Sequence, residues 1–349
     1  MVAHTIIGML TPRQEAILDK VVQAYLHDGQ PVASRTLAAD ENLDCGPSTV
    51  RNELAMLEEL GLLDHPHTSA GRIPTDAGQR YVVDRMLASG QSLLPARRVE
   101  LPLSRRELEE AMRVTSETLS QVTDLLAVVS APSLNTATIR HVEVLRLQPQ
   151  MVMVVVITST GGVSKLLTTF DRPVDPGLVT WAGEYLNERL AGLGLGARML
   201  HQRLHDVTLG HRESTFLDRL GTAFVGLAAE SEDALYVDGT ARLFSDQHMR
   251  DVSEMNELMG LLERRVALLE VLRSALTESG MYVRIGQENE LPALRSLAMV
   301  ATGYGLASRK LGTVSVIGPV RMDYAGVITT VRDVAQELSR FVEHAYAGN

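Results

Sequence analysis

Cysteine and aromatic residues are scarce in this chain of 349 residues. Cys45 is the only cysteine, so the chain cannot form an internal disulfide or a cysteine-rich zinc site. A single cysteine also suits a reducing compartment. The sequence therefore gives no indication of a disulfide-stabilised fold or of thiol redox chemistry.

Long hydrophobic runs are missing as well. The longest, MVMVVVITS at residues 151–159, is far shorter than the roughly 20 residues that a membrane-spanning helix needs. We expect it to be a buried strand. The apolar start, VAHTIIGML, lacks the basic stretch and the small-residue cleavage site of a signal peptide. These absences predict a cytoplasmic protein with no membrane partner.

Positive charge is in deficit. The chain has 33 Lys and Arg against 43 Asp and Glu, a formal net charge of -10. Its 45% of hydrophobic residues is ordinary for a globular protein, and the length allows two or three domains. The acidic balance argues against a protein that coats nucleic acid through bulk charge. Any DNA binding must come from a small local patch.

Three helices are predicted in the first 61 residues. Thr11-Pro12-Arg13-Gln14 combines a hydroxyl N-cap, a proline at the first helical position and a glutamine three residues after the cap, which together start a helix. Gly29 and Pro31 end it. Residues 34–40 are expected to form a short second helix, and Pro47 opens a third that runs to Gly61. A short helix, a tight turn and a longer helix are typical of a helix-turn-helix.

The third helix has two distinct faces. Its helical period places Val50, Leu54, Leu57 and Leu60 on the inner side. Ser48, Arg51 and Asn52 fall on the outer side near the N-terminal end, where a recognition helix meets the major groove. Arginine pairs with guanine edges and asparagine with adenine edges. Taken alone, the same face is more typical of an ordinary solvated helix surface.

A hairpin follows this helix and decides between the two interpretations. Residues 62–65 and 72–74 are strand candidates on either side of the loop HPHTSAG, and Thr75 caps a fourth helix. Helix, turn, helix and hairpin form a winged helix, with Gly71 expected at the tight tip of the wing. Thr68 and Arg72 are placed to touch sugar-phosphate. A phosphate-binding P-loop is excluded because its terminal Gly-Lys-Ser/Thr is missing.

The charge of this region limits its affinity for DNA. Residues 1–85 hold seven basic and twelve acidic side chains. Non-specific affinity is therefore expected to be poor, and specific binding must rely on a dimer that doubles a modest set of contacts.

Five stretches resemble the heat-inducible transcription repressor family HrcA. They are STVRNELAMLEELGLL (48–63), HTSAGRIPTDAGQRYVVD (67–84), LYVDGTARLF (235–244), IGQENE (285–290) and IGPVRMDY (317–324). They span nearly the whole chain in the order of the family. One departure is Gly46-Pro47, which stands where a serine cap before the recognition helix is expected. Glycine is an acceptable N-cap and proline a good first residue, so we expect the helix to form at the cost of one phosphate contact.

The resemblance implies a repressor of chaperonin and Hsp70-type chaperone operons. Such a protein binds an inverted-repeat operator of the CIRCE type as a homodimer, is relieved by heat and is modulated by the chaperonin. The predicted DNA contacts in this chain are Ser34, Arg35, Ser48, Thr49, Arg51, Asn52, Thr68 and Arg72.

The rest of the chain predicts an α+β multidomain protein. The expected division is a winged helix-turn-helix domain over 1–90, a linker and connecting helix over 91–130, a GAF-like sheet domain from 131–204 with 281–349, and a helix-rich inserted dimerising domain over 205–280. The names GAF-like and dimerising come from the resemblance. The apolar segment MNELMGLLERRVALLEVLRSAL at 255–276 fits either a dimer interface or the core of one subunit.

Other functions have weaker support. A GAF-like domain suggests a metabolite-sensing repressor as the alternative, but no polar cluster singles out a ligand. His201 and His205 have helical spacing without the glutamate of a zinc protease, and Gly192, Gly194 and Gly196 follow a helix rather than a strand. We therefore predict no catalytic residues, no cofactor and no metal site.

Overall fold

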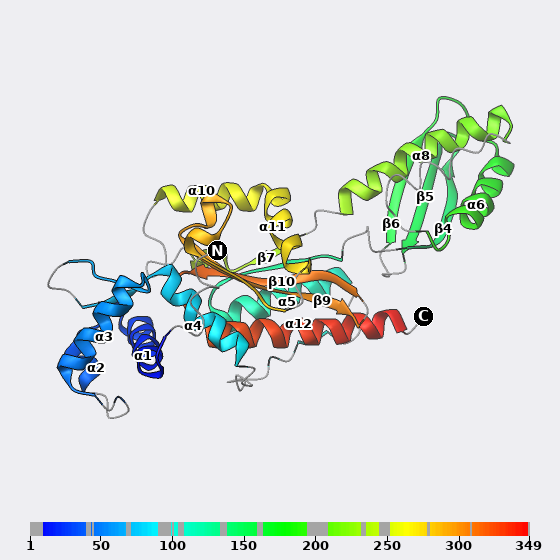
Figure 1. The fold of residues 1–349 in the computed structure, drawn as a ribbon. Helices are drawn as coiled ribbons and strands as arrows, with labels where there is room; N and C mark the ends of the chain where they lie inside the picture. The colour runs from blue at the N-terminus through cyan, green and yellow to red at the C-terminus, as the bar shows by residue number, and fades with distance from the viewer. Residues whose placement is uncertain are drawn as a thin grey trace.

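The computed structural model describes residues 10–39, 43, 45–67, 71–89, 99, 101–103, 108–132, 138–158, 163–193, 209–231, 235–243, 252–277, 280–307 and 309–347. They form an N-terminal helical domain, a central sheet domain and a second, smaller sheet with its own helices (Figure 1). Among the described residues, no helix is long and apolar enough to cross a membrane.

The N-terminal domain is a winged helix. Its elements are α1 (Pro12–Asp28), α2 (Ser34–Ala38), α3 (Pro47–Glu59), β1 (Leu63–Asp64), β2 (Ile73–Pro74) and α4 (Asp76–Ala88). The predicted capping box of Thr11 and Gln14 is present, and Thr75 caps α4 by accepting from the Gly78 amide. Gly46 is the N-cap of α3, and Pro47 takes the first helical position. The helices enclose one buried core that includes Ile17, Val50, Leu57 and Tyr81.

Two details of the winged helix differ from the sequence prediction. Helix α3 ends at Glu59, so Leu60 leaves the inner face and is 43% exposed. Gly71 lies against the chain at Val32, where an added Cβ would stand 2.4 Å from the Val32 carbonyl. Gly71 is therefore required for close approach of two backbones. Residues 68–70, between the two strands of the wing, lie outside the described residues.

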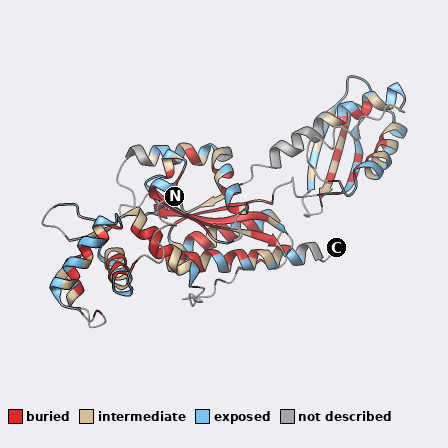
Figure 2. Cartoon of the chain, viewed as in Figure 1, coloured by how far each residue is buried: buried red, intermediate tan, exposed pale blue. Residues whose placement is uncertain are grey.

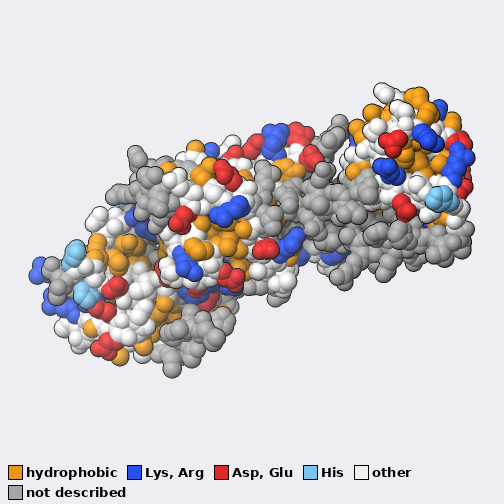
Figure 3. All heavy atoms as spheres, turned by 90° about the horizontal axis from the view of Figure 1, so that it is seen from above, with side chains coloured by type: hydrophobic (Ala, Val, Ile, Leu, Met, Phe, Trp, Pro, Cys, Tyr) orange, Lys and Arg blue, Asp and Glu red, His pale blue; other side chains and the backbone are white. Residues whose placement is uncertain are grey.

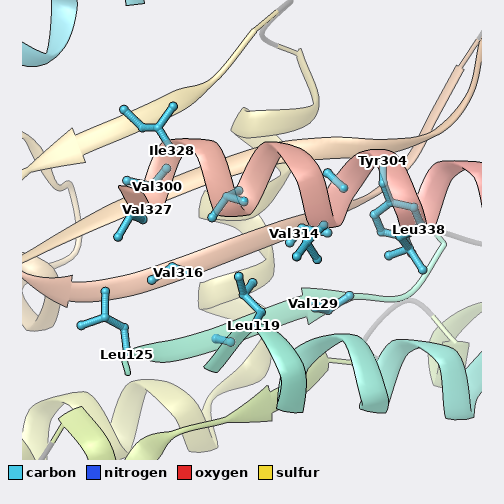
Figure 4. Packing of buried hydrophobic residues seen from close by; sticks show 14 of the residues in the cluster. Leu119, Leu125, Val129, Val300, Tyr304, Val314, Val316, Val327, Ile328 and Leu338 are labelled. Carbon is cyan, nitrogen blue, oxygen red and sulfur yellow. The ribbon is translucent and has the colours of Figure 1, made fainter. Parts of the chain in front are cut away.

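The central domain is built on a five-stranded antiparallel sheet. The strand order is β7-β3-β10-β9-β8, with β3 (Leu126–Ser130), β7 (Leu235–Asp238), β8 (Tyr282–Ile285), β9 (Leu297–Leu306) and β10 (Arg309–Pro319). The helices α5 (Leu108–Thr123) and α12 (Tyr324–Ala347) cover one face. Side chains alternate along the strands, so Val129, Val300, Val314 and Val316 point into this layer together with Leu119, Ile328 and Leu338 (Figure 4).

The other face of the central sheet is covered by α10 (Val252–Glu263) and α11 (Arg265–Thr277). Leu258, Leu261, Leu268 and Leu272 of these helices are buried against sheet residues such as Met299. These leucines of segment 255–276 therefore pack into the core of one subunit. Both faces of the central sheet are buried, as the red strands of Figure 2 show.

The second sheet is a separate unit. It has the order β4-β5-β6, with β4 (Ile139–Gln148), β5 (Met151–Thr158) and β6 (Val163–Thr169), and one of its faces is covered by α6 (Pro176–Leu190) and α8 (His211–Ser231). The buried residues Val142, Val144, Val152, Val154 and Val156 pack on these two helices.

This pairing corrects the expected division of the chain. Residues 139–169 do not share a sheet with 281–349, because they pair only with one another among the described strands. Conversely, β7 and the helices α10 and α11 belong to the central domain rather than to an insertion at 205–280. The inserted unit therefore corresponds to about residues 139–231.

The segment 91–130 also differs from a linker with one long helix. Helix α5 ends at Thr123, and Asp124 adopts a left-handed conformation with φ 57°. The apolar run that follows, which the prediction included in the linker and connecting helix over 91–130, is the buried strand β3. A left-handed residue breaks a helix, so the β-branched residues after it are free to pair with β7 and β10.

The outer face of the small sheet is apolar and uncovered by any described helix. Leu145 of β4 is 38% exposed, and Val163 and Leu167 of β6 are 56% and 63% exposed. Met153 and Val155 of β5 lie between them on the same face, by the strand register. We call these five residues, with Ile157, the outer sheet face. Exposed apolar side chains gathered on one face mark an interaction surface.

Replacement of glycine by alanine is expected to have opposite effects on stability at two helical positions, Gly78 and Gly183. In α4, a Cβ on Gly78 would stand 2.1 Å from the Leu62 carbonyl oxygen, whereas in α6 the nearest atom to a Cβ on Gly183 is 3.9 Å away. We expect Gly78→Ala to destabilise the protein by about 1–3 kcal/mol through overpacking. Gly183→Ala is expected to stabilise it by up to about 1 kcal/mol, the helix propensity gain of alanine. Thermal unfolding followed by circular dichroism tests both, and a Gly78→Ala protein as stable as the parent would contradict this packing of α4.

Candidate nucleic-acid interface

The predicted recognition face is formed by the N-terminal ends of α2 and α3. Val50, Leu54 and Leu57 are buried, whereas Ser48, Arg51 and Asn52 are exposed on the opposite side of α3. The Arg51 Nε donates to the Ser34 hydroxyl on α2 at 3.4 Å. The structure thus brings together Ser34, Arg51 and their neighbours from two helices, as a helix-turn-helix requires.

The basic side chains on this face differ from the other arginines of the domain. Arg13, Arg72, Arg80 and Arg85 all pair with carboxylates of the protein. Arg35 and Arg51 have no carboxylate partner among the described residues, and both are exposed. Figure 3 shows Lys and Arg side chains at this end of the molecule. The acidic domain therefore presents its uncompensated positive charge where α2 and α3 begin.

The wing arginine has a different environment from the one expected. Arg72 Nε pairs with Glu58 Oε2 at 2.7 Å, and His65 Nδ1 lies 2.6 Å from the other oxygen of that carboxylate. The Arg72 backbone also exchanges two hydrogen bonds with Val32. Arg72 therefore fastens the wing to α3, and Thr68 lies outside the described residues. The sequence carried no signal for Glu58, because its partners come from a different element of the fold.

A substitution of Arg72 separates its two roles. If Arg72 touches phosphate as well as Glu58, Arg72→Ala should weaken all duplexes by a similar factor and lower the salt slope of binding by about 1 per bound copy, about 2 for a dimer. Affinities for operator and scrambled duplexes at several salt concentrations test this. A loss confined to one base position would contradict the phosphate role.

Helix α4 is fastened to α1 by polar contacts. The Tyr81 hydroxyl donates to Glu15 Oε1 at 2.6 Å, and Arg85 pairs with Glu15 and Asp19. Burial, followed by the bond to Glu15, raises the pKa of Tyr81 to about 12. Tyr81 therefore remains a hydrogen-bond donor throughout the neutral range.

A small pocket lies in the central domain, away from this face. It has a volume of about 110 Å³ between α11 and the segment that follows β8, and Tyr282, Arg284, Asn289 and Glu270 are among its lining residues. Among the described residues, no group of three or more His, Cys, Asp or Glu is placed to hold a metal ion.

Comparisons with known proteins agree with this architecture. Residues 9–84 match a family model described as the winged helix-turn-helix transcription repressor, HrcA DNA-binding, and residues 109–328 match the HrcA protein C-terminal domain. A crystal structure of a hypothetical protein has a similar fold, with a TM-score of 0.62 and 21% identity over 95% of this chain and 98% of that one.

Curated relatives of similar length carry one name. The heat-inducible transcription repressor HrcA of Streptomyces avermitilis is 36% identical over 96% of this chain and 99% of its own. The repressor of the same name from Brevibacillus brevis is 31% identical over 96% of this chain and 98% of its own. With both halves of the chain matched by the family models, the protein belongs to the HrcA family of heat-inducible transcription repressors.

Proposed function

We propose that this protein represses chaperonin and Hsp70-type chaperone operons by binding a CIRCE-type inverted repeat as a homodimer. The observation that carries the proposal is the unpaired positive charge of Arg35 and Arg51 beside Ser48 and Asn52 on a helix-turn-helix. The family supports it, because the curated relatives are named heat-inducible transcription repressors. Such a repressor acts in the cytoplasm, where operator DNA lies.

In this proposal α3 enters the major groove with its N-terminal end. Arg51 reads a guanine edge and Asn52 an adenine edge, while Ser48 and Thr49 contact the backbone beside them. Ser34 and Arg35, at the start of α2, reach the phosphates that flank the groove. The acidic C-terminal end of α3, at Glu58 and Glu59, is kept away from the phosphates.

A homodimer follows from the weakness of one winged helix. The domain is acidic, and among its described arginines only Arg35 and Arg51 lack a carboxylate partner, so a single copy binds few phosphates. Two copies on an inverted repeat double these contacts. The outer sheet face supplies the contact, since its exposed leucines and valine form an apolar surface that a second copy buries.

Charges on this face indicate how two copies meet. Glu143 of β4 and Lys165 of β6 both lie opposite Val155 of the central strand β5. A two-fold axis along β5 places β4 of one copy over β6 of the other. Glu143 then faces the partner's Lys165, and Leu145 faces the partner's Leu167. The surface is therefore complementary to itself in both charge and apolar area.

Heat relieves repression in this proposal by separating the dimer or loosening its domains. An interface between copies loses stability with temperature, and separation removes half of the DNA contacts. The chaperonin is the proposed modulator that maintains the active fold. Unfolded proteins that occupy the chaperonin would then leave the repressor without support.

The alternative function is a metabolite-sensing repressor that uses the central pocket. A volume of about 110 Å³ is small beside the roughly 300–1,000 Å³ of most small-molecule sites. The size of this pocket therefore gives little support to a metabolite site in it.

A gel-shift titration tests the proposal. The purified protein is titrated at fixed salt against a duplex with the chaperone-operon inverted repeat and against a scrambled duplex, each with and without chaperonin. Selective binding that strengthens with chaperonin is the expected result. No preference for the repeat under either condition would contradict the proposal and favour the metabolite-sensing alternative.

A further inference from the structure

Helix α4 belongs to two hydrophobic cores at once. Tyr81 and Val82 are buried in the core of the winged helix, whereas the next residue, Val83, is buried in the core of the central sheet domain. Figure 1 shows α4 between the N-terminal helices and the central domain. Because one rigid helix packs into both cores, the winged helix cannot turn relative to the central domain without disturbing one of them.

An ion pair between a largely buried arginine and a partly exposed glutamate joins the two domains at the same helix. Arg80 of α4 donates from Nε to Glu288 Oε1 at 2.9 Å and from one terminal nitrogen to Glu288 Oε2 at 2.7 Å. The same nitrogen donates to the Val283 carbonyl at 2.6 Å, and the other donates to Asp84 at 3.0 Å. The Arg80 side chain is only 11% exposed. A bidentate arginine–carboxylate pair fixes orientation as well as distance.

Two further contacts close the joint on either side of this pair. Asp76, at the start of α4, accepts from the Gln287 amide at 3.0 Å. It packs so closely on Gly286 that a Cβ there would lie 1.9 Å from the Asp76 carboxylate. Arg321, which precedes α12, donates to the Leu26 carbonyl of α1 at 3.3 Å and lies over the Tyr25 ring. The winged helix is therefore held at more than one point.

The residues of this joint belong to two of the family-like motifs, and neither motif is accounted for by contact with DNA. Gly286, Gln287 and Glu288 belong to IGQENE, and Arg321 belongs to IGPVRMDY. Neither motif lies on the recognition face. Both lie where the central domain meets the winged helix.

We propose that Arg80 and Glu288 are positioning residues for operator recognition, through which the central domain fixes the orientation of the winged helix. The inference rests on the proposed function. In a dimer, the spacing of two half-sites is read by the distance between the two recognition helices. A rigid joint sets that distance, whereas domains joined only by a small polar interface move relative to one another.

Breaking the Arg80–Glu288 pair should let the winged helix move relative to the central domain, while the residues of the recognition face stay unchanged. Arg80→Ala removes every hydrogen bond that this side chain makes across the joint, to Glu288 and to the Val283 carbonyl. Glu288→Gln removes the charge that attracts Arg80 across the joint, while Arg80 keeps its pair with Asp84, so both changes loosen the joint. Each winged helix then binds its half-site as before, but the second half-site is captured from a tether rather than from a fixed frame. A dimer with tethered winged helices binds repeats of many spacings, but its affinity for any one spacing is lower than that of a rigid dimer for its matching spacing.

The test uses the full-length protein and a series of duplexes. One duplex carries a single half-site, one carries the natural inverted repeat, and the others lengthen or shorten the spacer by about half a helical turn and one turn. Arg80→Ala and the milder Glu288→Gln are compared with Arg242→Ala, which removes an exposed pair with Asp124 inside the central domain. Circular dichroism and sedimentation verify that each variant is folded and dimeric.

We expect the parent and Arg242→Ala to bind the natural spacing best. Arg80→Ala and Glu288→Gln should keep the half-site affinity but lose on the order of tenfold in preference for the natural spacing. If folded, dimeric Glu288→Gln keeps the parent's spacing preference, the inference is wrong. A parent protein that ignores the inverted repeat altogether would instead contradict the proposed function.

Discussion

Replacing Arg51 by alanine is expected to abolish operator-specific binding while the protein remains folded and dimeric. Arg51 is exposed, and its only contact that we describe is a long hydrogen bond to Ser34, so its loss costs little stability. A bidentate arginine–guanine pair contributes about 1–3 kcal/mol of discrimination. Two copies bind one repeat, so the expected loss is about 2–6 kcal/mol, at least about 30-fold. Asn52→Ala should have an effect of the same order through its adenine contact.

The matched control for these variants lies on the same helix. Glu59→Ala changes another exposed side chain of α3, at the end that points away from the groove. It should leave operator affinity within a few-fold of the parent. Titration of the operator and of duplexes altered at single base pairs measures all three variants. Parent-like binding by either Arg51→Ala or Asn52→Ala would mean that the recognition face lies elsewhere.

The winged helix was predictable because its signals are local. The Thr11 capping box, Pro47 at the start of α3 and the Thr75 cap each depend on residues within one helical turn, and all three are present. The inner and outer faces of α3 follow from the helical period alone. Leu60 fails this rule, because the helix ends one residue before it.

The division of the chain was not predictable in the same way, because strand pairing is non-local. Strand β3 pairs with β7 and β10, which come from distant parts of the sequence, and each of the three is an ordinary apolar run. Alternation identifies a strand but not its neighbour. The strands of the small sheet are more polar than the central ones, as β4 shows, but this pattern does not say which strands pair, so their separation appears only in the register.

The charged contacts around the candidate site were missed for a related reason. Arg80 and Glu288 are 208 positions apart, and the partner of Arg72 lies on a different element. The sequence shows both arginines but not the carboxylates with which they form salt bridges. Once these pairs are known, Arg35 and Arg51 remain as the uncompensated cations among the described arginines of the domain, which sharpens the prediction for Arg51.

Leu167→Glu is expected to separate the dimer and to remove most of the operator affinity with it. Leu167 is 63% exposed on the outer sheet face, so a charge there is tolerated in the single chain but not against the partner's Leu145. Linking two binding modules raises affinity by roughly 100- to 10,000-fold, and this gain is what dissociation removes. Sedimentation velocity measures the assembly, and titration with the inverted repeat measures the affinity. Met259→Glu, a comparable apolar-to-charge change at a 40% exposed site on α10, should leave both unchanged.

The proposed pair of Glu143 with the partner's Lys165 can be tested by charge exchange, in which a second substitution should rescue the first. Lys165→Glu places a carboxylate against the partner's Glu143 and should weaken the dimer by repulsion. Glu143→Lys alone should weaken it in the same way. The double exchange restores one charge of each sign across the axis, so it should recover both dimer and operator binding. Recovery depends on the two side chains facing each other between copies, because within one chain Val155 separates them on the sheet. A Leu167→Glu protein that remains dimeric, or a double exchange no better than either single change, would place the dimer contact on another surface.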